Sequence, residues 1–149
     1  MSCTPEPADA VQAAERVAEA MIQLWRQAHK EIAPEVSDQQ MRTLLVLETG
    51  PRHLTSLAEQ MGVGPSSATR LCDRLGQRGL LERVSAGRQV RIQLTPAGEK
   101  LLHATREHRR ALLRQALATA GTDQTVLHDA LDQLCVLFTA LAPSCSNGP

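Results

Sequence analysis

Aromatic residues are almost absent from this chain, which has 149 residues but only one Trp, one Phe and no Tyr. A core without aromatic rings depends on Leu, Val, Ala and Met, and this composition favours helices over a β-sandwich. The chain also lacks a run of about 20 apolar residues, the length that a membrane-spanning helix requires. Its N-terminus, MSCTPEPADA, has neither the basic start nor the apolar centre of a signal peptide. We therefore expect a mainly α-helical protein that is cytoplasmic and has no membrane partner.

The sequence also lacks pairs of residues at the spacings typical of a metal site or a disulfide framework. No two cysteines form a Cys-x-x-Cys pair, and in a reducing cytosol such cysteines are more often free thiols than a disulfide framework. His103 and His108 are five residues apart, which makes them a poor pair for one metal ion on a helix. We predict no cofactor and no metal site, and a zinc site drawn from His29, His53, Cys72 or these two histidines is the alternative. The cysteines are Cys3, Cys72, Cys135 and Cys145.

The chain also lacks a net charge, because 16 Lys and Arg residues balance 16 Asp and Glu residues. The charges are nevertheless unevenly spread. Residues 65–114 contain eleven basic and four acidic residues, so this segment has seven excess positive charges that the rest of the chain balances. One positive face on a neutral protein is typical of a protein that binds a polyanion, and acidic surface elsewhere limits non-specific adhesion.

A helix-turn-helix is predicted in the middle of the chain. A capping box that starts at Ser37 opens one helix, which stops at Gly50. Thr55 can cap a short following helix, and a glycine-rich turn leads to Pro65, which suits the first position of the next helix. That helix is expected to run to about Arg78.

Two strands after this helix predict a wing. Residues 80–84 and 89–94 have strand character. In the second strand Val90, Ile92 and Leu94 alternate with polar residues, so we expect these three side chains on one face. A helix-turn-helix that is followed by such a hairpin indicates a protein that reads double-stranded DNA.

The second helix of such a motif lies in the major groove, and the amide groups at its N-terminus favour phosphate. Arg70 and Arg74 are four residues apart on one face and can reach guanine edges or the backbone. Arg88 at the hairpin tip can enter the minor groove, whereas Arg91 suits a phosphate contact. The predicted DNA-binding residues are Thr55, Ser66, Ser67, Thr69, Arg70, Arg74, Arg88 and Arg91.

Long amphipathic helices are predicted at both ends of the chain, where apolar residues recur at spacings of three and four. They carry more apolar surface than the central region could cover alone. A symmetric homodimer would bury this surface and place two recognition helices one DNA turn apart on a pseudo-palindromic operator, and a closed helical monomer is the alternative. The predicted organisation is an N-terminal dimerisation helix (1–36), a winged helix-turn-helix DNA-binding region (37–95) and C-terminal dimerisation helices with a tail (96–149).

The order and spacing of four segments resemble the multiple-antibiotic-resistance (MarR) regulator family. The segments are LAEQMGV at 57–63, SATRLCDRL at 67–75, GLLER at 79–83 and LTPAG at 94–98. The resemblance covers nearly the whole chain. It implies a winged-helix homodimer that usually represses a neighbouring promoter and releases it when a small molecule or an oxidant binds. The family's wing usually carries an Asp-x-Arg tip, and this chain lacks that Asp, so Arg88 is the best match for the wing arginine.

In related regulators the effector binds between the dimerisation helices and the winged-helix lobe, which changes the spacing of the recognition helices. An anionic aromatic acid that pairs with Arg42 or a histidine is one candidate effector. A redox switch at Cys72, beside the arginines of the recognition helix, is an alternative, although this position also fits a small buried hydrophobe. The residues predicted to contact an effector are Trp25, His29, Met41, Arg42 and His53.

Enzyme motifs are absent from the sequence, which has no nucleophile elbow and no phosphate-binding loop. A winged-helix module that binds another protein is a second possibility, because a fold alone does not establish nucleic-acid binding. The basic segment favours DNA over a protein partner. The sequence therefore predicts a dimeric, ligand-responsive transcriptional repressor with no enzymatic activity.

Overall fold

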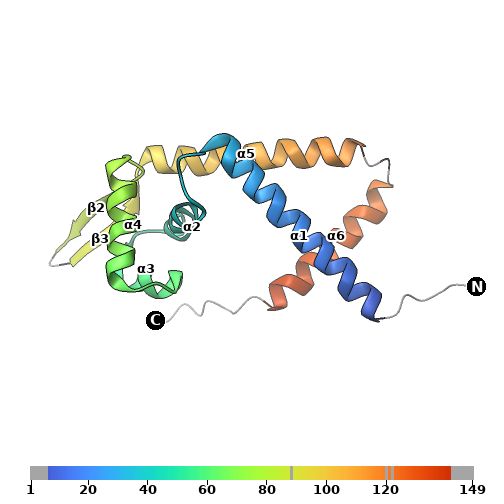
Figure 1. Ribbon diagram of the computed structural model, residues 1–149, viewed down its shortest axis with the longest axis horizontal. Coiled ribbons are helices and arrows are strands. Elements are labelled where there is room, and N and C mark those ends of the chain that lie inside the picture. The colour runs from blue at the N-terminus through green and yellow to red at the C-terminus, as the bar shows by residue number, and fades with distance from the viewer. Residues whose placement is uncertain (1–6, 88, 120, 122, 142–149) are drawn as a thin grey trace, which may run out of the picture. The chain divides into compact units, whose positions relative to one another are not determined.

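The computed structural model describes residues 7–87, 89–119, 121 and 123–141. It is mostly helical with a small antiparallel sheet, which confirms the predicted winged-helix fold class (Figure 1). Among these described residues, those from 22 to 112 form one compact unit, and those from 7 to 21 form a second unit with those from 113 to 141. The helices and strands, in chain order, are α1 (Pro7–Ile32), α2 (Asp38–Leu47), β1 (Arg52–His53), α3 (Leu54–Met61), α4 (Pro65–Gln77), β2 (Leu81–Ala86), β3 (Gln89–Leu94), α5 (Pro96–Thr119) and α6 (Gln124–Leu141).

Helix starts follow the predicted capping residues with one exception. At α2, the Ser37 hydroxyl oxygen accepts a hydrogen bond from the Gln40 amide and the Gln40 side chain accepts one from the Ser37 amide, which is the predicted capping box. Pro65 occupies the first turn of α4, as expected. The predicted cap at Thr55 is wrong, because α3 already begins at Leu54 and His53 takes the N-cap position without a capping hydrogen bond.

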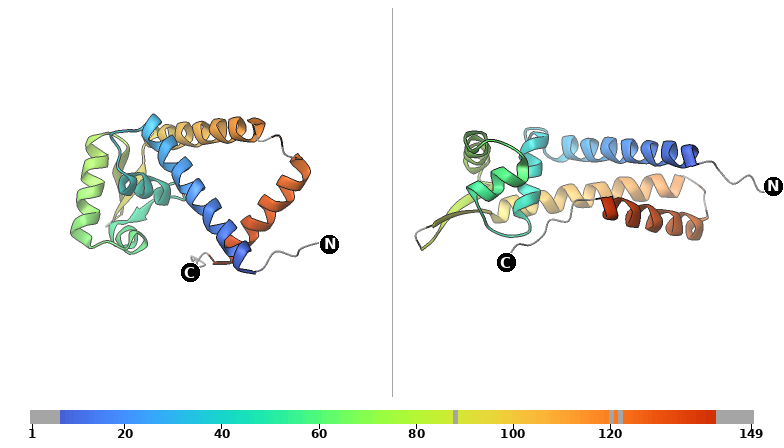
Figure 2. Two further views of the ribbon diagram at one scale, coloured as in Figure 1. Left: turned by 45° about the vertical axis from the view of Figure 1, so that its right-hand side comes forward. Right: turned by 90° about the horizontal axis from the view of Figure 1, so that it is seen from below.

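The sheet has the strand order β1-β3-β2, and all neighbours are antiparallel. The hairpin of β2 and β3 pairs from Leu81 with Leu94 out to Ala86 with Gln89, which confirms the predicted wing. Strand β1, which the sequence did not predict, pairs with the middle of β3. The hairpin projects away from α2, α3 and α4 (Figure 2). Gly87 at its tip has a φ of 66°, and Arg88 lies outside the described residues.

The alternation in β3 is only partly reflected in burial. Ile92 and Leu94 are 2% and 9% exposed and belong to the core. Val90 follows the same alternation along the strand but is 54% exposed. It pairs with Ser85 near the tip of the hairpin, where the strands have passed beyond the helices that cover the base of the sheet (Figure 2).

The core of residues 22–112 is built mainly from apolar side chains of α2, α3, α4 and the sheet, and α5 adds Leu102. Leu44, Leu57, Leu75 and Ile92 are among its most buried members. Burying aliphatic side chains of this size contributes about 1.5–3 kcal/mol each to stability. The core thereby fixes which face of α4 is turned inward.

Large apolar side chains remain exposed on the terminal helices of the single chain. They lie on α1, at the end of α5 and along α6. Within the described residues, none of the helices combines the length and the apolar character that crossing a membrane requires. The most exposed of these side chains are Val11, Met21, Ile22, Leu117, Val126, Leu131, Val136, Leu137 and Phe138.

Candidate nucleic-acid interface

Helix α4 has one buried and one exposed face. Ala68, Leu71, Cys72 and Leu75 are buried, and their spacing of three and four residues defines the inner face. The predicted DNA-contacting residues occupy the rest of the helix. The exposed ones are Ser66, Ser67, Arg70 and Arg74.

The arginines of this exposed face are available to an external partner. Within the described part of the chain, neither Arg70 nor Arg74 forms a hydrogen bond or an ion pair. Thr69 is half-buried, and its hydroxyl donates a 2.9 Å hydrogen bond to the Pro65 carbonyl, so only its acceptor capacity remains free. The face therefore presents two free guanidinium groups and two serine hydroxyls.

An ion pair that sequence analysis missed connects α4 to the wing. The Arg83 Nη2 atom of β2 lies 2.7 Å from the Asp73 Oδ1 atom, and the two side chains are 51% and 47% exposed. Such exposed pairs contribute about 1 kcal/mol at most, so this contact orients the wing more than it stabilises the fold. An acid and a base ten positions apart across a turn form no local pattern that could have revealed it.

The remaining predicted DNA contacts lie near the sheet. Arg91 is exposed on β3, and Thr55 is exposed in the first turn of α3. The pairing of β1 with β3 places His53 opposite Arg91, so the chain brings His53, Thr55 and Arg91 into one region. Arg88 lies outside the described residues, and its role at the wing tip stays a prediction.

The five predicted effector residues differ widely in exposure. Trp25 is 38% exposed, and the Arg109 guanidinium carbon lies 3.7 Å from the centre of its ring, which is a cation–π contact. Arg42 is exposed and Met41 is buried in the core. His53 lies on the sheet instead, opposite Arg91.

His29, the fifth of these residues, connects α1 to α2. Its side chain is 3% exposed, and its Nδ1 atom lies 3.1 Å from Asp38 Oδ1 in the first turn of α2. Its Nε2 atom is buried and has no hydrogen-bond partner among the described residues. The imidazole therefore holds the end of one helix against the start of the next.

The end of α1 also contacts α5 through polar groups. The Glu31 carboxylate accepts a 3.0 Å hydrogen bond from the Gln27 side chain and contacts His108 Nε2. Both hydrogen bonds lower the pKa of Glu31, and the one from Gln27 has the larger effect. Burial, with smaller effects from neighbouring arginines, lowers the pKa of Arg109. The guanidinium nevertheless stays protonated and can contact Trp25 as a cation.

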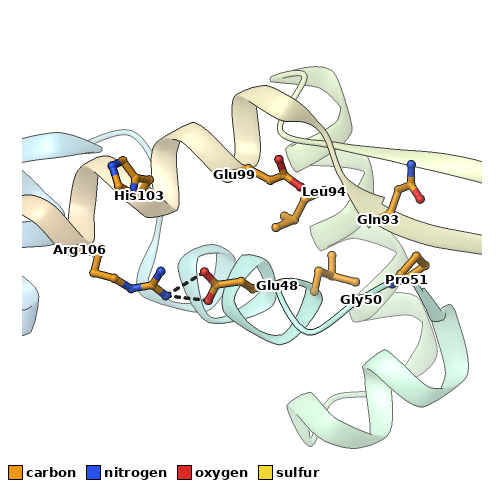
Figure 3. Close-up of a pocket in the computed structure, with 9 residues that line it drawn as sticks. Glu48, Gly50, Pro51, Gln93, Leu94, Glu99, His103 and Arg106 are labelled. Atoms are coloured by element: carbon orange, nitrogen blue, oxygen red, sulfur yellow. Dashed lines mark hydrogen bonds and ion pairs between the residues drawn. The ribbon is translucent and has the colours of Figure 1, made fainter.

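A pocket of about 470 Å³ lies between the end of α2, the end of β3 and α5 (Figure 3). Arg106 reaches across it and donates to both carboxylate oxygens of Glu48, each at 2.8 Å (Figure 3). Glu99 and His103 line the same side of α5. None of the five predicted effector residues lines this pocket. Among the described residues, no three His, Cys, Asp or Glu side chains gather into a group that could hold a metal ion.

Cys72 lies on the buried face of α4 and is 1% exposed. Burial raises the pKa of its thiol, and this effect outweighs the opposite effect of the positive charge of Arg83. A thiol with a raised pKa contains little thiolate at neutral pH and reacts slowly with electrophiles and oxidants. Both features favour a structural role over the redox alternative.

We expect a maleimide to alkylate Cys135, which is exposed on α6, much faster than Cys72 in the folded protein. Mass spectrometry of digested samples taken over time resolves the two cysteines. In urea the difference should disappear, which provides the control. Alkylation of Cys72 at the rate of Cys135 under native conditions would contradict the structural role and revive the redox switch.

Comparison with known proteins gives a consistent set of relatives. A model of the MarR family matches residues 35–92. RV1404 from Mycobacterium tuberculosis has a similar fold, with a TM-score of 0.81 and 23% sequence identity over 97% of this chain and 100% of its own. A MarR family protein from Bacillus stearothermophilus gives a TM-score of 0.70 and 26% identity over 91% of this chain and 99% of its own. A mutant of MepR from Staphylococcus aureus, bound to an oligodeoxyribonucleotide, gives a TM-score of 0.67 and 16% sequence identity over 89% of this chain and 97% of its own. No curated protein matches the chain.

Proposed function

This chain belongs to the MarR family through residues 35–92, and from that premise we propose that it is a homodimeric transcriptional repressor of neighbouring genes that works in the cytoplasm. Members of this family are transcriptional regulators and not enzymes. The proposed target is a pseudo-palindromic DNA duplex, with α4 in the major groove and the hairpin of β2 and β3 beside it. We propose the same functional division as the sequence suggests, with the DNA-binding region at 37–95 between dimerisation segments at 1–36 and 96–149.

The observation that carries this proposal is the exposed face of α4. Arg70 and Arg74 lie on it without a hydrogen-bond or ion-pair partner in the part of the chain that the structure describes, and the short side chains of Ser66 and Ser67 allow close approach to a groove. The bound oligodeoxyribonucleotide in the structure of the MepR mutant supports DNA as the partner of this fold. A protein partner is the alternative, and the excess of basic residues in 65–114 favours DNA.

Dimerisation is supported by the exposed apolar side chains of α1, the end of α5 and α6. Monomeric soluble proteins rarely expose large contiguous apolar patches. A symmetric dimer would bury these side chains and separate the two copies of α4 by about 34 Å, one turn of DNA.

We propose that a small molecule releases the protein from DNA by binding at one of two positions. Of the five predicted residues, Trp25 and Arg42 are exposed enough for a ligand to reach, whereas His29 and Met41 would require a rearrangement. The pocket that Glu48 and Arg106 cross offers a second position for an effector (Figure 3). A ligand there would compete with the contact between these two side chains and so act on the packing of α2 against α5.

The proposed function is tested by a mobility-shift titration of the purified protein on the DNA upstream of its own coding region. We expect a saturable shift that survives excess non-specific DNA and weakens at least about tenfold between about 50 and about 200 mM salt, because phosphate contacts release counterions. The stoichiometry should be two chains per operator. A protein that shows no specific shift on this or other genomic fragments would be reassigned to protein binding.

A further inference from the structure

His53 occupies an unusual position at the junction of β1 and α3. It is the second residue of β1 and also the N-cap residue of α3, with φ of −72° and ψ of 149°. Its side chain makes no capping hydrogen bond. Serine, threonine, asparagine and aspartate are the side chains that usually cap a helix, so the imidazole at this position leaves the capping role unfilled.

The register of the sheet places His53 in a row with Arg91. His53 is the partner of Arg91 across β1 and β3, and Val84 is the partner of Arg91 across β2 and β3. Residues directly opposite each other on antiparallel strands project from the same face. The next residue of β3, Ile92, is 2% exposed on the core side, so His53, Arg91 and Val84 lie on the face turned away from the core.

The charges around His53 are positive. Arg91 is opposite it on β3, and Arg52 precedes it on β1, where its guanidinium donates a 2.7 Å hydrogen bond to the Thr49 hydroxyl. Helix α3, which packs against β1, has Glu59 as its one charged residue, well beyond the first turn. Within the described residues, neither the His53 imidazole nor the Arg91 guanidinium has a hydrogen-bond or ion-pair partner.

This arrangement presents two basic side chains, those of His53 and Arg91, to one external anion. The third member of the row, Val84, carries no charge. A phosphate group placed against the row would attract both the guanidinium and a protonated imidazole. Imidazoles change charge close to neutral pH, so a contact between an imidazole and a phosphate couples the binding of a proton to the binding of the phosphate.

We propose that His53 is a DNA phosphate-binding residue that takes up a proton when the operator binds, so that DNA affinity increases as the pH falls. The proposal rests on the proposed DNA-binding function and replaces the effector role predicted for His53. It assigns His53 and Arg91 to one phosphate, with the exposed Thr55 hydroxyl two residues further along the chain. By linkage, a proton that binds with the DNA must raise the affinity for DNA by the same factor.

The test is a fluorescence-anisotropy titration of labelled operator at about pH 6 and about pH 8, at constant ionic strength, because imidazoles titrate between these values. We expect the wild type to bind about tenfold more tightly at the lower pH. His53→Asn should bind with the same affinity at both pH values, within about a factor of two. Asn is chosen because it is neutral and is a good N-cap residue, so α3 should be preserved.

The matched control is His103→Asn, which removes an exposed histidine from α5 and should leave the pH dependence unchanged. Thermal melting of each variant checks that the fold is retained, and His53→Gln provides a second neutral variant. If His53→Asn shows the same pH dependence of DNA affinity as the wild type, or if the wild type shows none, the proposal is overturned while the DNA-binding function stands. If none of the proteins binds operator at either pH, the proposed function itself fails.

Discussion

Replacing Gly98 with Ala is expected to lower the free energy of unfolding by about 3 kcal/mol. A Cβ atom at this buried position in the first turn of α5 would lie 2.1 Å from the Leu80 carbonyl oxygen and 3.3 Å from a Leu94 methyl group. The start of α5 and the segment around Leu80 cannot easily move apart. The Thr95 amide donates a hydrogen bond to the same Leu80 oxygen, and the Thr95 hydroxyl donates one to the Gly79 carbonyl. Urea denaturation measures the loss directly.

Gly76→Ala is the control for this substitution. Gly76 lies near the end of α4, and a Cβ there would have its nearest neighbours at 3.8 Å, an ordinary contact distance. Alanine has a higher helix propensity than glycine, so this variant should be unchanged or more stable by up to about 1 kcal/mol. Equal stabilities for the two variants would contradict the close approach of α5 to the Leu80 carbonyl oxygen.

Removing both free arginines of α4 should have the largest effect on DNA binding. Arg70→Ala and Arg74→Ala are each expected to cost about 1–3 kcal/mol of binding free energy, and the double variant should lose specific binding at concentrations that saturate the wild type. Neither side chain forms a hydrogen bond or an ion pair among the described residues, so stability should change by less than about 0.5 kcal/mol. Anisotropy titrations on specific and scrambled duplexes separate base contacts from phosphate contacts.

Arg16→Ala serves as the charge-matched control, because Arg16 is exposed on α1 and lies outside the basic segment. It should weaken binding by no more than about twofold, the small effect of removing one distant and screened charge. An Arg70→Ala, Arg74→Ala protein that binds operator as well as this control would exclude α4 as the recognition helix.

Local signals in the sequence predicted most of the helices and the wing. The capping box at Ser37 and Pro65 at the start of α4 act within a few residues, so their effect can be seen in the sequence itself. The inner face of α4 followed from apolar spacing, since the core buries the residues that repeat every three or four positions.

Features that depend on distant parts of the chain could not be predicted in this way. Strand β1 has two residues, Arg52 and His53, which is too short for a period of two to be visible, and it forms only because β3 is beside it. The exposure of Val90 depends on where the helices stop covering the sheet, and alternation along one strand does not contain this information. The partners of Arg83 and Arg106 are likewise set by tertiary packing.

The position of β1 has a consequence for where this chain can be cut. A fragment that begins at the helix-turn-helix itself, at Leu54, would remove Arg52 and His53 and leave the middle of β3 as an open sheet edge with unpaired backbone groups. Such edges recruit other strands and cause aggregation. A minimal DNA-binding fragment should therefore also include the connection that follows α2. Chimeric proteins made from two relatives should take the segment before α3 and the wing from the same parent.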